Sequence, residues 1–255
     1  MKRTYIEEAA RLFANSRKNR QPLSGLALGL SPLNIEHAHA IQDATVEMLG
    51  EPVAGWKANF IQGGVSRAPL LASRVLQGPV ILEFSSPAES ASIEAEIAFR
   101  FVRDMPPREA AYTRAELESA VTALAVVEVL GTRFCTNAEV TELDRMADCM
   151  SNEWLVVGSG RPIADSTVLS NVEVSLSVNQ REVVRHVGGH PVSDPLLPAL
   201  ALVNDARSKT GVHAGCIVTT GSCTGLTLIR PGDKVTARFS GVGDVEMQWA
   251  NYPQQ

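Results

Sequence analysis

The stretch that decides the fold class is Ala91-Ser-Ile-Glu-Ala-Glu-Ile-Ala-Phe-Arg-Phe101. Apolar residues occupy every odd position, whereas Glu94 and Glu96 stand at even positions. This period of two predicts a β-strand with one apolar face. Both glutamates then project from the same side of the strand, about 7 Å apart at the backbone. Two like charges at that spacing repel each other unless water or a cation lies between them.

A third acidic residue, Glu128, lies in the otherwise apolar run Leu124–Leu130. A lone carboxylate in such a run is costly to bury without a partner. Together with Glu94 and Glu96 it would form an oxygen-rich set that suits a hard divalent cation, Mg²⁺ or Mn²⁺. Two plainer interpretations stay open: a solvated strand face for the first two glutamates, and a buried salt bridge for Glu128, for example to Arg133.

The rest of the chain divides into a helical start and a strand-rich remainder. Apolar residues at helical spacing predict one helix near the N-terminus and a second over about residues 34–48. From residue 53 onward, short β-branched runs alternate with turn residues, and the pair Asn179-Gln180 fits a hairpin turn. Two further helices are expected, one over 113–124 behind a capping box and one over 194–207. We therefore predict an α+β fold, with a helical N-terminal lobe at residues 1–52 and a mixed β-rich catalytic domain at residues 53–255.

Composition argues against a protein that binds nucleic acid or membranes. The 255 residues are 45% hydrophobic and 20% charged, with a formal net charge of −5, as expected for a globular protein without a basic surface for nucleic acid or anionic lipid. No apolar run is long enough to span a bilayer, and the N-terminus lacks the apolar centre of a signal peptide. Four scattered cysteines without zinc-ligand spacing suggest reduced thiols. These features predict a cytoplasmic protein that binds neither membrane nor nucleic acid.

The order of motifs resembles the hydratase/decarboxylase branch of the fumarylacetoacetate hydrolase superfamily, which includes 2-oxopent-4-enoate hydratases and 4-oxalocrotonate decarboxylases. The strand with Glu94-x-Glu96 and the later Glu128 carry the resemblance. Five further segments support it: Gly55-Trp56-Lys57, Glu128-Val-Leu-Gly-Thr-Arg133, Ala147-Asp-Cys-Met-Ser-Asn152, Thr220-Gly-Ser-Cys-Thr-Gly225 and Pro231-Gly-Asp233. The helix containing Ile35-Glu-His-Ala-His-Ala-Ile-Gln42 also matches. The resemblance covers nearly the whole chain and implies a β-roll body.

The resemblance implies a Mg²⁺-dependent lyase that acts on an unsaturated 2-oxo acid through a metal-stabilised enolate, as in aromatic meta-cleavage catabolism. Lys57 would neutralise the enolate or act as a general acid/base if burial and the cation lower its pKa; the alternative is an exposed lysine lying along Trp56. Asp148 would orient Lys57 or accept a proton; alternatively it caps a turn. Arg133 would bind a distal substrate carboxylate, or pair with a glutamate.

The loop with Gly221, Ser222 and Thr224 offers N–H groups and hydroxyls to a substrate carboxylate, although it also fits a plain hairpin turn. One element of the hydratases is missing. They carry a Pro-Asp-aromatic-Gly segment after the lysine, whereas this chain has Arg67-Ala-Pro-Leu-Leu-Ala-Ser-Arg74. Gly131 and Cys149 also stand where many relatives have Asp and Asn. The second acid/base is therefore not assigned by the sequence.

Hydration of a 2-hydroxydienoate is the first prediction and 4-oxalocrotonate-type decarboxylation the second. A hydrolase that cleaves the C–C bond of an acylpyruvate-like 1,3-dicarbonyl and a non-catalytic accessory subunit are further alternatives. We expect a homo-oligomer, and the resemblance adds a complex with a related decarboxylase or hydratase as a further option.

Overall fold

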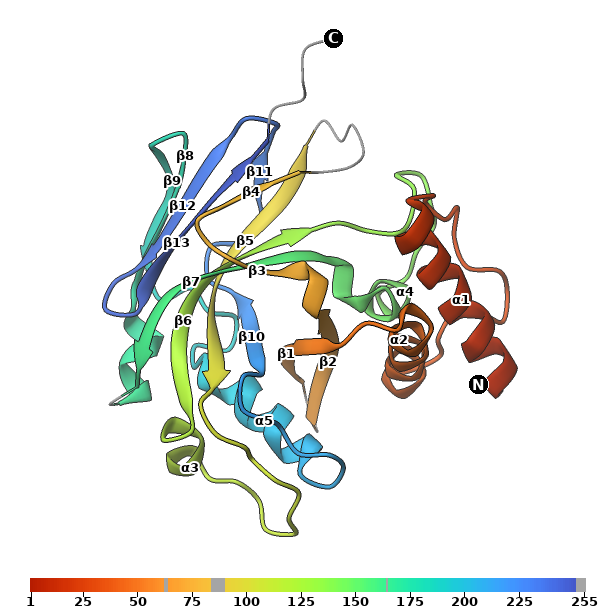
Figure 1. The fold of residues 1–255 in the computed structure, drawn as a ribbon, viewed down its shortest axis with the longest axis horizontal. Helices are drawn as coiled ribbons and strands as arrows, with labels where there is room; N and C mark the ends of the chain where they lie inside the picture. Colours follow the sequence, from red (N-terminus) through yellow and green to blue (C-terminus); the bar gives the residue numbers. More distant parts are fainter. Residues whose placement is uncertain (62–63, 84–89, 164, 251–255) are drawn as a thin grey trace.

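The computed structural model describes residues 1–61, 64–83, 90–163 and 165–250 (Figure 1). The α-helices are α1 (Arg3–Asn19), α2 (Ile35–Leu49), α3 (Arg114–Glu118), α4 (Glu142–Ala147) and α5 (Leu196–Ala206). The strands are β1 (Val53–Ile61), β2 (Gly64–Leu71), β3 (Val75–Gln77), β4 (Val80–Leu82), β5 (Ala91–Phe101), β6 (Val121–Leu130), β7 (Asn152–Pro162), β8 (Glu173–Val178), β9 (Arg181–Val187), β10 (Ile217–Ser222), β11 (Thr227–Ile229), β12 (Lys234–Phe239) and β13 (Gly243–Trp249). Short 3₁₀ turns η1 (Ala72–Arg74), η2 (Cys149–Ser151) and η3 (Ser166–Asn171) complete the set. The expected α+β class is confirmed.

These strands form two sheets. In the described chain the larger sheet has eight strands, in the order β2-β1-β10-β5-β6-β7-β3, with β11 paired to β5. The smaller sheet has the order β4-β13-β12-β8-β9. Its strand β13 packs across β6 and β7, while α5 packs against β1, β2 and β10. Figure 1 shows the larger sheet curling between these two layers.

The alternating residues of β5 divide between two cores. Ile93, Ile97, Phe99 and Phe101 belong to the main hydrophobic cluster, which extends to the smaller sheet. Ala98 instead belongs to a second cluster on the other face, together with residues of β2, β6, β7 and β10. Both faces of β5 are therefore buried, because the sheet curls over the side that carries the glutamates. The interpretation as a solvated strand face is wrong for Glu96, because this residue is only 2% exposed.

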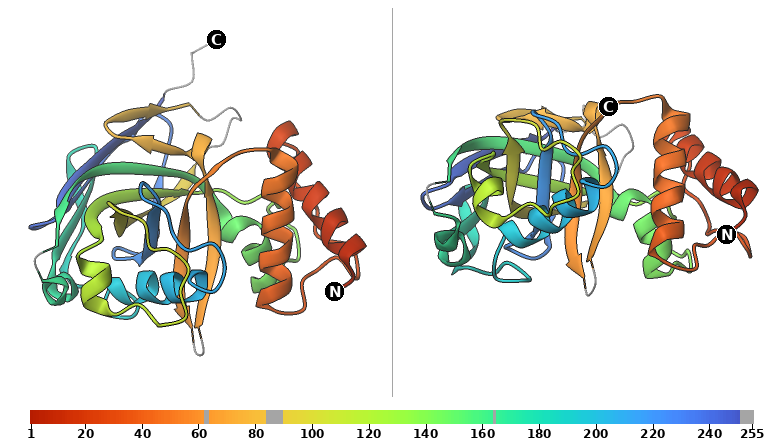
Figure 2. Two further views of the ribbon diagram at one scale, coloured as in Figure 1. Left: turned by 60° about the horizontal axis from the view of Figure 1, so that its bottom comes forward. Right: turned by 90° about the horizontal axis from the view of Figure 1, so that it is seen from below.

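The N-terminal helices pack into a separate lobe beside the sheets (Figure 2). Phe13 of α1 meets Phe134 edge-on, with ring centroids 5.6 Å apart. Helix α2 begins after Asn34, whose side chain accepts a hydrogen bond from the His37 N–H, and ends at Gly50 with φ of 69°. Helix α4 packs against α2, so the lobe also contains residues from beyond position 52. The domain boundary at residue 52 stays a prediction.

One expected helix is much shorter than predicted. The capping box of Thr113 and Glu116 is present, yet α3 ends at Glu118. The run that follows forms β6 from Val121 onward, paired along its length with β5 and β7. Its β-branched, apolar side chains are buried on both faces, and that packing outweighs local helix preference. The hairpin turn at Asn179-Gln180 is confirmed, with positive φ at both residues.

Candidate metal centre and active site

Strand pairing brings the three glutamates together. Glu94 of β5 lies directly opposite Glu128 of β6, and Glu96 lies opposite Ser222 of β10. One carboxylate oxygen from each glutamate falls within 4.8 Å of the other two. Glu128 is fully buried and Glu94 is partly exposed. The sequence predicts a strand for Glu94 and Glu96 and only an apolar run around Glu128, and the antiparallel register of β5 with β6 makes the three converge.

Lys57 reaches the same cluster from β1. Its Nζ lies 2.7 Å from Glu128 Oε1 and donates to the Met150 carbonyl oxygen at 3.0 Å. The parallel pairing of β1 with β10 sets this position. Gly55 makes the close approach possible, because a Cβ there would lie 1.9 Å from the Ile217 carbonyl oxygen. The buried salt bridge that the sequence allowed for Glu128 therefore exists, with Lys57 as partner rather than Arg133.

Burial and mutual repulsion perturb these ionisable groups. Burial, followed by the neighbouring charge of Glu128, raises the pKa of Glu96 to about 8. Burial likewise raises the pKa of Glu94. For Lys57, burial works to lower the pKa, but the charges of Glu128 and Glu96 outweigh it, so the pKa of Lys57 is raised. Lys57 is therefore protonated in the metal-free protein. A general base would need a lowered pKa, so the shift is in the opposite direction.

The donor set fits a divalent cation. Glu128 Oε1 already has two protein partners: it forms an ion pair with Lys57 Nζ and accepts a hydrogen bond from Asn152 Nδ2 at 2.8 Å. Its other oxygen, Oε2, is buried and has no hydrogen-bond partner in the described chain. A buried carboxylate oxygen without a partner is costly, and carboxylate oxygens are the ligands that Mg²⁺ and Mn²⁺ prefer. Glu94, Glu96 and Glu128 are accordingly the residues that would hold the ion.

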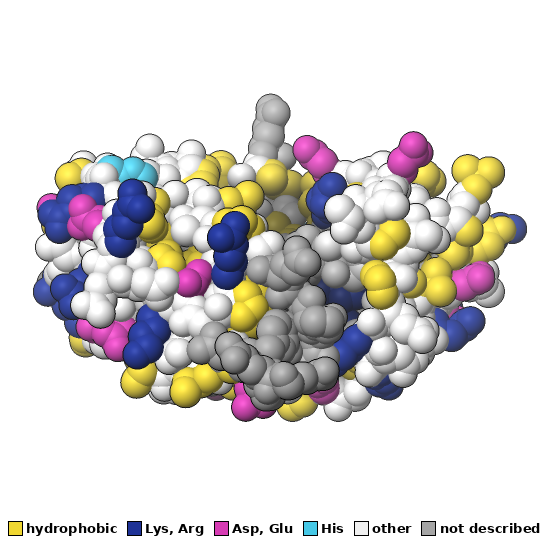
Figure 3. Space-filling model, turned by 90° about the horizontal axis from the view of Figure 1, so that it is seen from above, with side chains coloured by type: hydrophobic (Ala, Val, Ile, Leu, Met, Phe, Trp, Pro, Cys, Tyr) yellow, Lys and Arg dark blue, Asp and Glu magenta, His cyan; other side chains and the backbone are white. Residues whose placement is uncertain are grey.

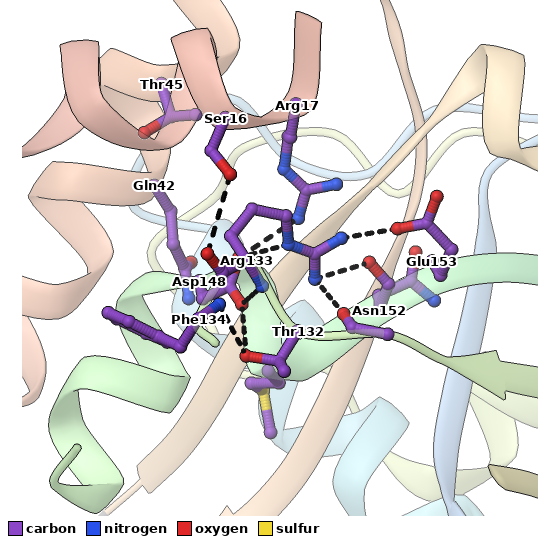
Figure 4. A network of polar contacts seen from close by, with 12 residues as sticks. Ser16, Arg17, Gln42, Thr45, Thr132, Arg133, Phe134, Asp148, Asn152 and Glu153 are labelled. Carbon is purple, nitrogen blue, oxygen red and sulfur yellow. Dashed lines mark hydrogen bonds and ion pairs between the residues drawn. The ribbon is translucent and has the colours of Figure 1, made fainter. Parts of the chain in front are cut away.

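Asp148 and Arg133 belong to a neighbouring polar network rather than to the glutamate cluster (Figure 4). Arg133 donates from Nε to Asp148 Oδ1 at 2.6 Å and from its backbone N–H to Oδ2 at 2.8 Å. The same guanidinium contacts Glu153 Oε2 at 2.5 Å and the carbonyl oxygens of Gly131 and Asn152. Both Arg133 and Asp148 are buried. The network fixes the turn at residues 148–152, which supplies both the carbonyl of Met150 to Lys57 and the side chain of Asn152 to Glu128.

The loop after β10 braces the glutamates. The Gly221 N–H donates to Glu96 Oε2 at 3.2 Å, and Thr224 Oγ1 accepts from the Ala95 N–H at 3.0 Å. Ser222 hydrogen-bonds Glu94 and thereby works to lower the pKa of that carboxyl, against the larger effect of burial. The three loop residues therefore contact the glutamates and the β5 backbone, and their role in substrate binding stays a prediction.

A pocket of about 660 Å³ opens over the cluster. Lys57, Glu94, Met146 and Met150 are among its lining residues. That volume lies within the range of small-molecule sites. The lining combines two cations (Lys57 and Arg145), two carboxylates (Glu94 and Glu142) and the thioethers of Met146 and Met150, which suits a short, charged, partly apolar ligand.

Two contributors were not assigned from the sequence. Asn152 ends one of the motifs that carry the family resemblance, and its amide donates to Glu128 and orients that carboxylate. Arg17 of α1 lies 3.6 Å from Asp148 Oδ1 through its Nη2 atom. Helical spacing carries a signal for Arg17, because it follows the buried Phe13 by four residues and therefore shares its face.

Comparison with known proteins agrees with this architecture. The sequence model for the fumarylacetoacetate (FAA) hydrolase C-terminal domain matches residues 55–249. The chain belongs to this family. It is 25% identical to the 2-keto-4-pentenoate hydratase of Paraburkholderia xenovorans (strain LB400), over 95% of this chain and 94% of that protein. It is 26% identical to the 4-oxalocrotonate decarboxylase of Pseudomonas putida, over 48% of this chain and 47% of that protein.

Solved structures show the same fold. The 4-oxalocrotonate decarboxylase from Pseudomonas putida G7, complexed with magnesium and adipate, superposes with a TM-score of 0.78 at 19% identity, covering 98% of each chain. The fumarylpyruvate hydrolase from Pseudomonas aeruginosa, in complex with Mn²⁺ and pyruvate, gives a TM-score of 0.56 at 12% identity, covering 79% of this chain and 91% of that one. The predicted family and fold are thereby confirmed.

Proposed function

We propose that the protein is a Mg²⁺-dependent (or Mn²⁺-dependent) lyase that hydrates a 2-hydroxydienoate or related unsaturated 2-oxo acid. The metal part of the proposal rests on the buried Oε2 atom of Glu128, which lies in a cluster of three glutamates and has no hydrogen-bond partner among the residues that the structure describes. The full-length similarity to a 2-keto-4-pentenoate hydratase supports the reaction. When bound, the divalent cation supplies the positive charge that stabilises an enolate at the 2-oxo group.

Lys57 is the proton-carrying group in this proposal. Its Nζ is buried and protonated, and it lines the pocket between Glu128 and the Met150 carbonyl. The ammonium can therefore donate a proton to, or hydrogen-bond, an anionic substrate that enters the pocket. Asp148 acts on Lys57 indirectly, because it holds Arg133 and with it the 148–152 turn. We assign Asp148 a positioning role on this ground.

The substrate carboxylate has two candidate partners in the proposal. The loop of Gly221, Ser222 and Thr224 stands beside Glu94 and Glu96. Arg133 stands deeper, with its guanidinium already engaged by Asp148 and Glu153. We therefore propose that the 2-oxo acid end of the substrate binds at the loop of Gly221, Ser222 and Thr224, and that Arg133 supports the pocket without binding the substrate.

The test is an absorbance assay with 2-hydroxypenta-2,4-dienoate. We expect loss of dienoate absorbance with Mg²⁺, no loss after EDTA treatment, and recovery when the metal is restored. Glu94→Gln should lower the rate at least about a hundredfold while the protein stays folded. Turnover that persists in EDTA, or full activity in Glu94→Gln, would refute the proposal.

Decarboxylation of a 4-oxalocrotonate-like substrate is the second candidate, and one observation favours it. Strand β2, which runs beside β1 and Lys57, contains no acidic residue. Water addition needs a group that accepts a proton from water, whereas loss of CO₂ does not. Metal-dependent CO₂ release without hydration would select this reaction. Pyruvate release from an acylpyruvate would instead indicate the C–C bond hydrolase.

Assembly and location remain predictions. No helix in the described residues has the length and apolar character needed to cross a membrane. We propose a cytoplasmic homo-oligomer, alone or with a related decarboxylase or hydratase. Light scattering of the purified chain, and co-purification with such a partner, test these two assemblies.

A further inference from the structure

The pocket over the metal cluster has two walls. The first carries the side chains that the proposed function uses, Lys57 on β1 and Glu94 on β5. The second includes residues of the short helix α4, which lies beside α2, between that helix and the strands (Figure 2). Figure 3 shows one face of the molecule hollowed between the strand-rich body and the helical lobe. A ligand at the glutamates therefore also meets side chains from α4.

One face of α4 is turned toward the pocket. Glu142, Arg145 and Met146 all line it, and they stand at positions i, i+3 and i+4, which share one side of a helix. Asp144 and Ala147 are buried on the remaining side. The helical spacing therefore agrees with the pocket lining, and it assigns the Glu142 side chain to the same space as Lys57 and Glu94.

Both ends of α4 are held by side chains. At its start, Thr141 Oγ1 accepts from the Asp144 N–H at 3.1 Å, and Asp144 Oδ2 accepts from the Thr141 N–H at 2.8 Å. At its end, the carboxylate of Asp148 is paired with Arg133 at 2.6 Å. Glu142, the first residue of the helix, therefore stands at a fixed place on the pocket wall.

The Glu142 carboxylate is free to react. It is exposed, and within the described chain it has neither a hydrogen-bond partner nor an ion-pair partner. Among the described residues that line this pocket, the other carboxylate is that of Glu94, which belongs to the metal cluster. Glu142 is thus the carboxylate on this pocket wall that neither the cluster nor a protein cation engages.

Water addition needs a proton acceptor that neither β2 nor Lys57 provides. Strand β2 contains no acidic residue. Lys57 pairs with Glu128 and donates to the Met150 carbonyl oxygen, so it is placed as a proton donor. A carboxylate on the wall formed by α4 supplies the acceptor from a different element. The lack of an acid on β2, which favours decarboxylation, is therefore compensated by Glu142.

We infer that Glu142 is the general base that takes a proton from the attacking water. The inference rests on the proposed function and extends it. The water oxygen bonds to C4 of the unsaturated 2-oxo acid while its proton passes to Glu142. The C3=C4 electron pair becomes the C2=C3 bond of an enolate, and Lys57 then donates a proton to C3. The proton on Glu142 returns to Lys57 through solvent, so the net change is addition of one water.

The first test is the rate of hydration of 2-hydroxypenta-2,4-dienoate with Mg²⁺. Glu142→Gln should lower kcat at least about a hundredfold, the usual contribution of a general base, and change KM little because the carboxylate acts on water. Glu139→Gln is the matched control, since Glu139 is exposed three residues earlier and lies outside the pocket lining. Its kcat should equal that of the wild type.

Two further measurements separate a base from a structural support. Calorimetric titration of the Mg²⁺-loaded protein with 2-oxopentanoate, which has no double bond to hydrate, should give the same affinity for Glu142→Gln as for the wild type. Added formate should restore part of the hydration rate of Glu142→Ala, because a small carboxylate can replace the missing one at an exposed position. Formate should not restore Lys57→Ala, which lacks the proton donor.

The outcomes separate this inference from the proposed function. A wild type that hydrates the dienoate, together with a Glu142→Gln variant that is equally fast, would overturn the inference and leave the proposed function standing. Loss of 2-oxopentanoate binding in Glu142→Gln, or a Glu142→Ala rate that formate does not raise, would also overturn it. If the wild type neither hydrated the dienoate nor bound 2-oxopentanoate with Mg²⁺, the proposed function would fail and the inference with it.

Discussion

Replacing Glu96 by glutamine should stabilise the metal-free protein. Burial and the charge of Glu128 raise the pKa of Glu96 from 4.5 to about 8. At pH 7 the folded state therefore keeps a proton on Glu96 that the unfolded chain releases. Because the unfolded state binds fewer protons over this range, stability falls as pH rises from 4.5 toward 8 and then levels off.

The size of the effect follows from that interval. Between pH 4.5 and pH 7, each unit costs about 1.4 kcal/mol, so the penalty at pH 7 is about 3 kcal/mol. Glu96→Gln removes the ionisable group but keeps an oxygen that can accept from the Gly221 N–H. The free energy of unfolding of the metal-free variant should exceed that of the wild type by up to about 3 kcal/mol at pH 7 and match it near pH 4.

Urea unfolding followed by tryptophan fluorescence, in EDTA at several pH values, measures this difference. Glu47→Gln is the matched control, because Glu47 is exposed on α2, and it should change stability by less than about 0.5 kcal/mol. In Mg²⁺ the order should reverse, since the wild type gains binding energy that the variant loses. A destabilised Glu96→Gln protein in EDTA at pH 7, or a gain that does not vary with pH, would refute the reasoning.

Three further predictions concern the same region. Lys57→Met leaves the fully buried Glu128 without its cationic partner, so the metal-free protein should lose about 3 to 5 kcal/mol in urea unfolding, part of which Mg²⁺ restores; an unchanged midpoint would contradict the ion pair. Asp148→Asn removes the buried carboxylate beside Arg133, which then keeps Glu153 as its only acidic partner among the described residues, and should cost up to a similar amount. Asp43→Asn, at a pair whose Asp side chain is 53% exposed, should cost less than about 1 kcal/mol; equal losses would show that burial of the network does not matter. Adding Mg²⁺ at a hundred times its dissociation constant should raise the free energy of unfolding by about 3 kcal/mol, and a melting temperature that ignores both Mg²⁺ and EDTA would argue against a metal centre.

Local patterns in the sequence were sufficient for several elements. Alternation identified β5 and both of its glutamates, and apolar residues at helical spacing placed the second helix at about 34–48, close to the observed Ile35–Leu49. Local patterns failed where long-range packing decided the outcome. The run after Ser119 became the central strand β6 instead of the end of a helix, because β5 and β7 were available to pair with it on both sides.

The sequence by itself therefore determined which residues carry charge, which faces are apolar, and which family the chain resembles. Only the tertiary structure decided how those residues meet. It paired Glu128 with Lys57 rather than Arg133, turned Asp148 toward Arg133 and Arg17, and placed Arg17 of α1 at a pocket that adjoins the one over the metal cluster. The reason is physical: a carboxylate's partner is set by strand register and helix docking across many residues of separation, and no local pattern encodes that distance.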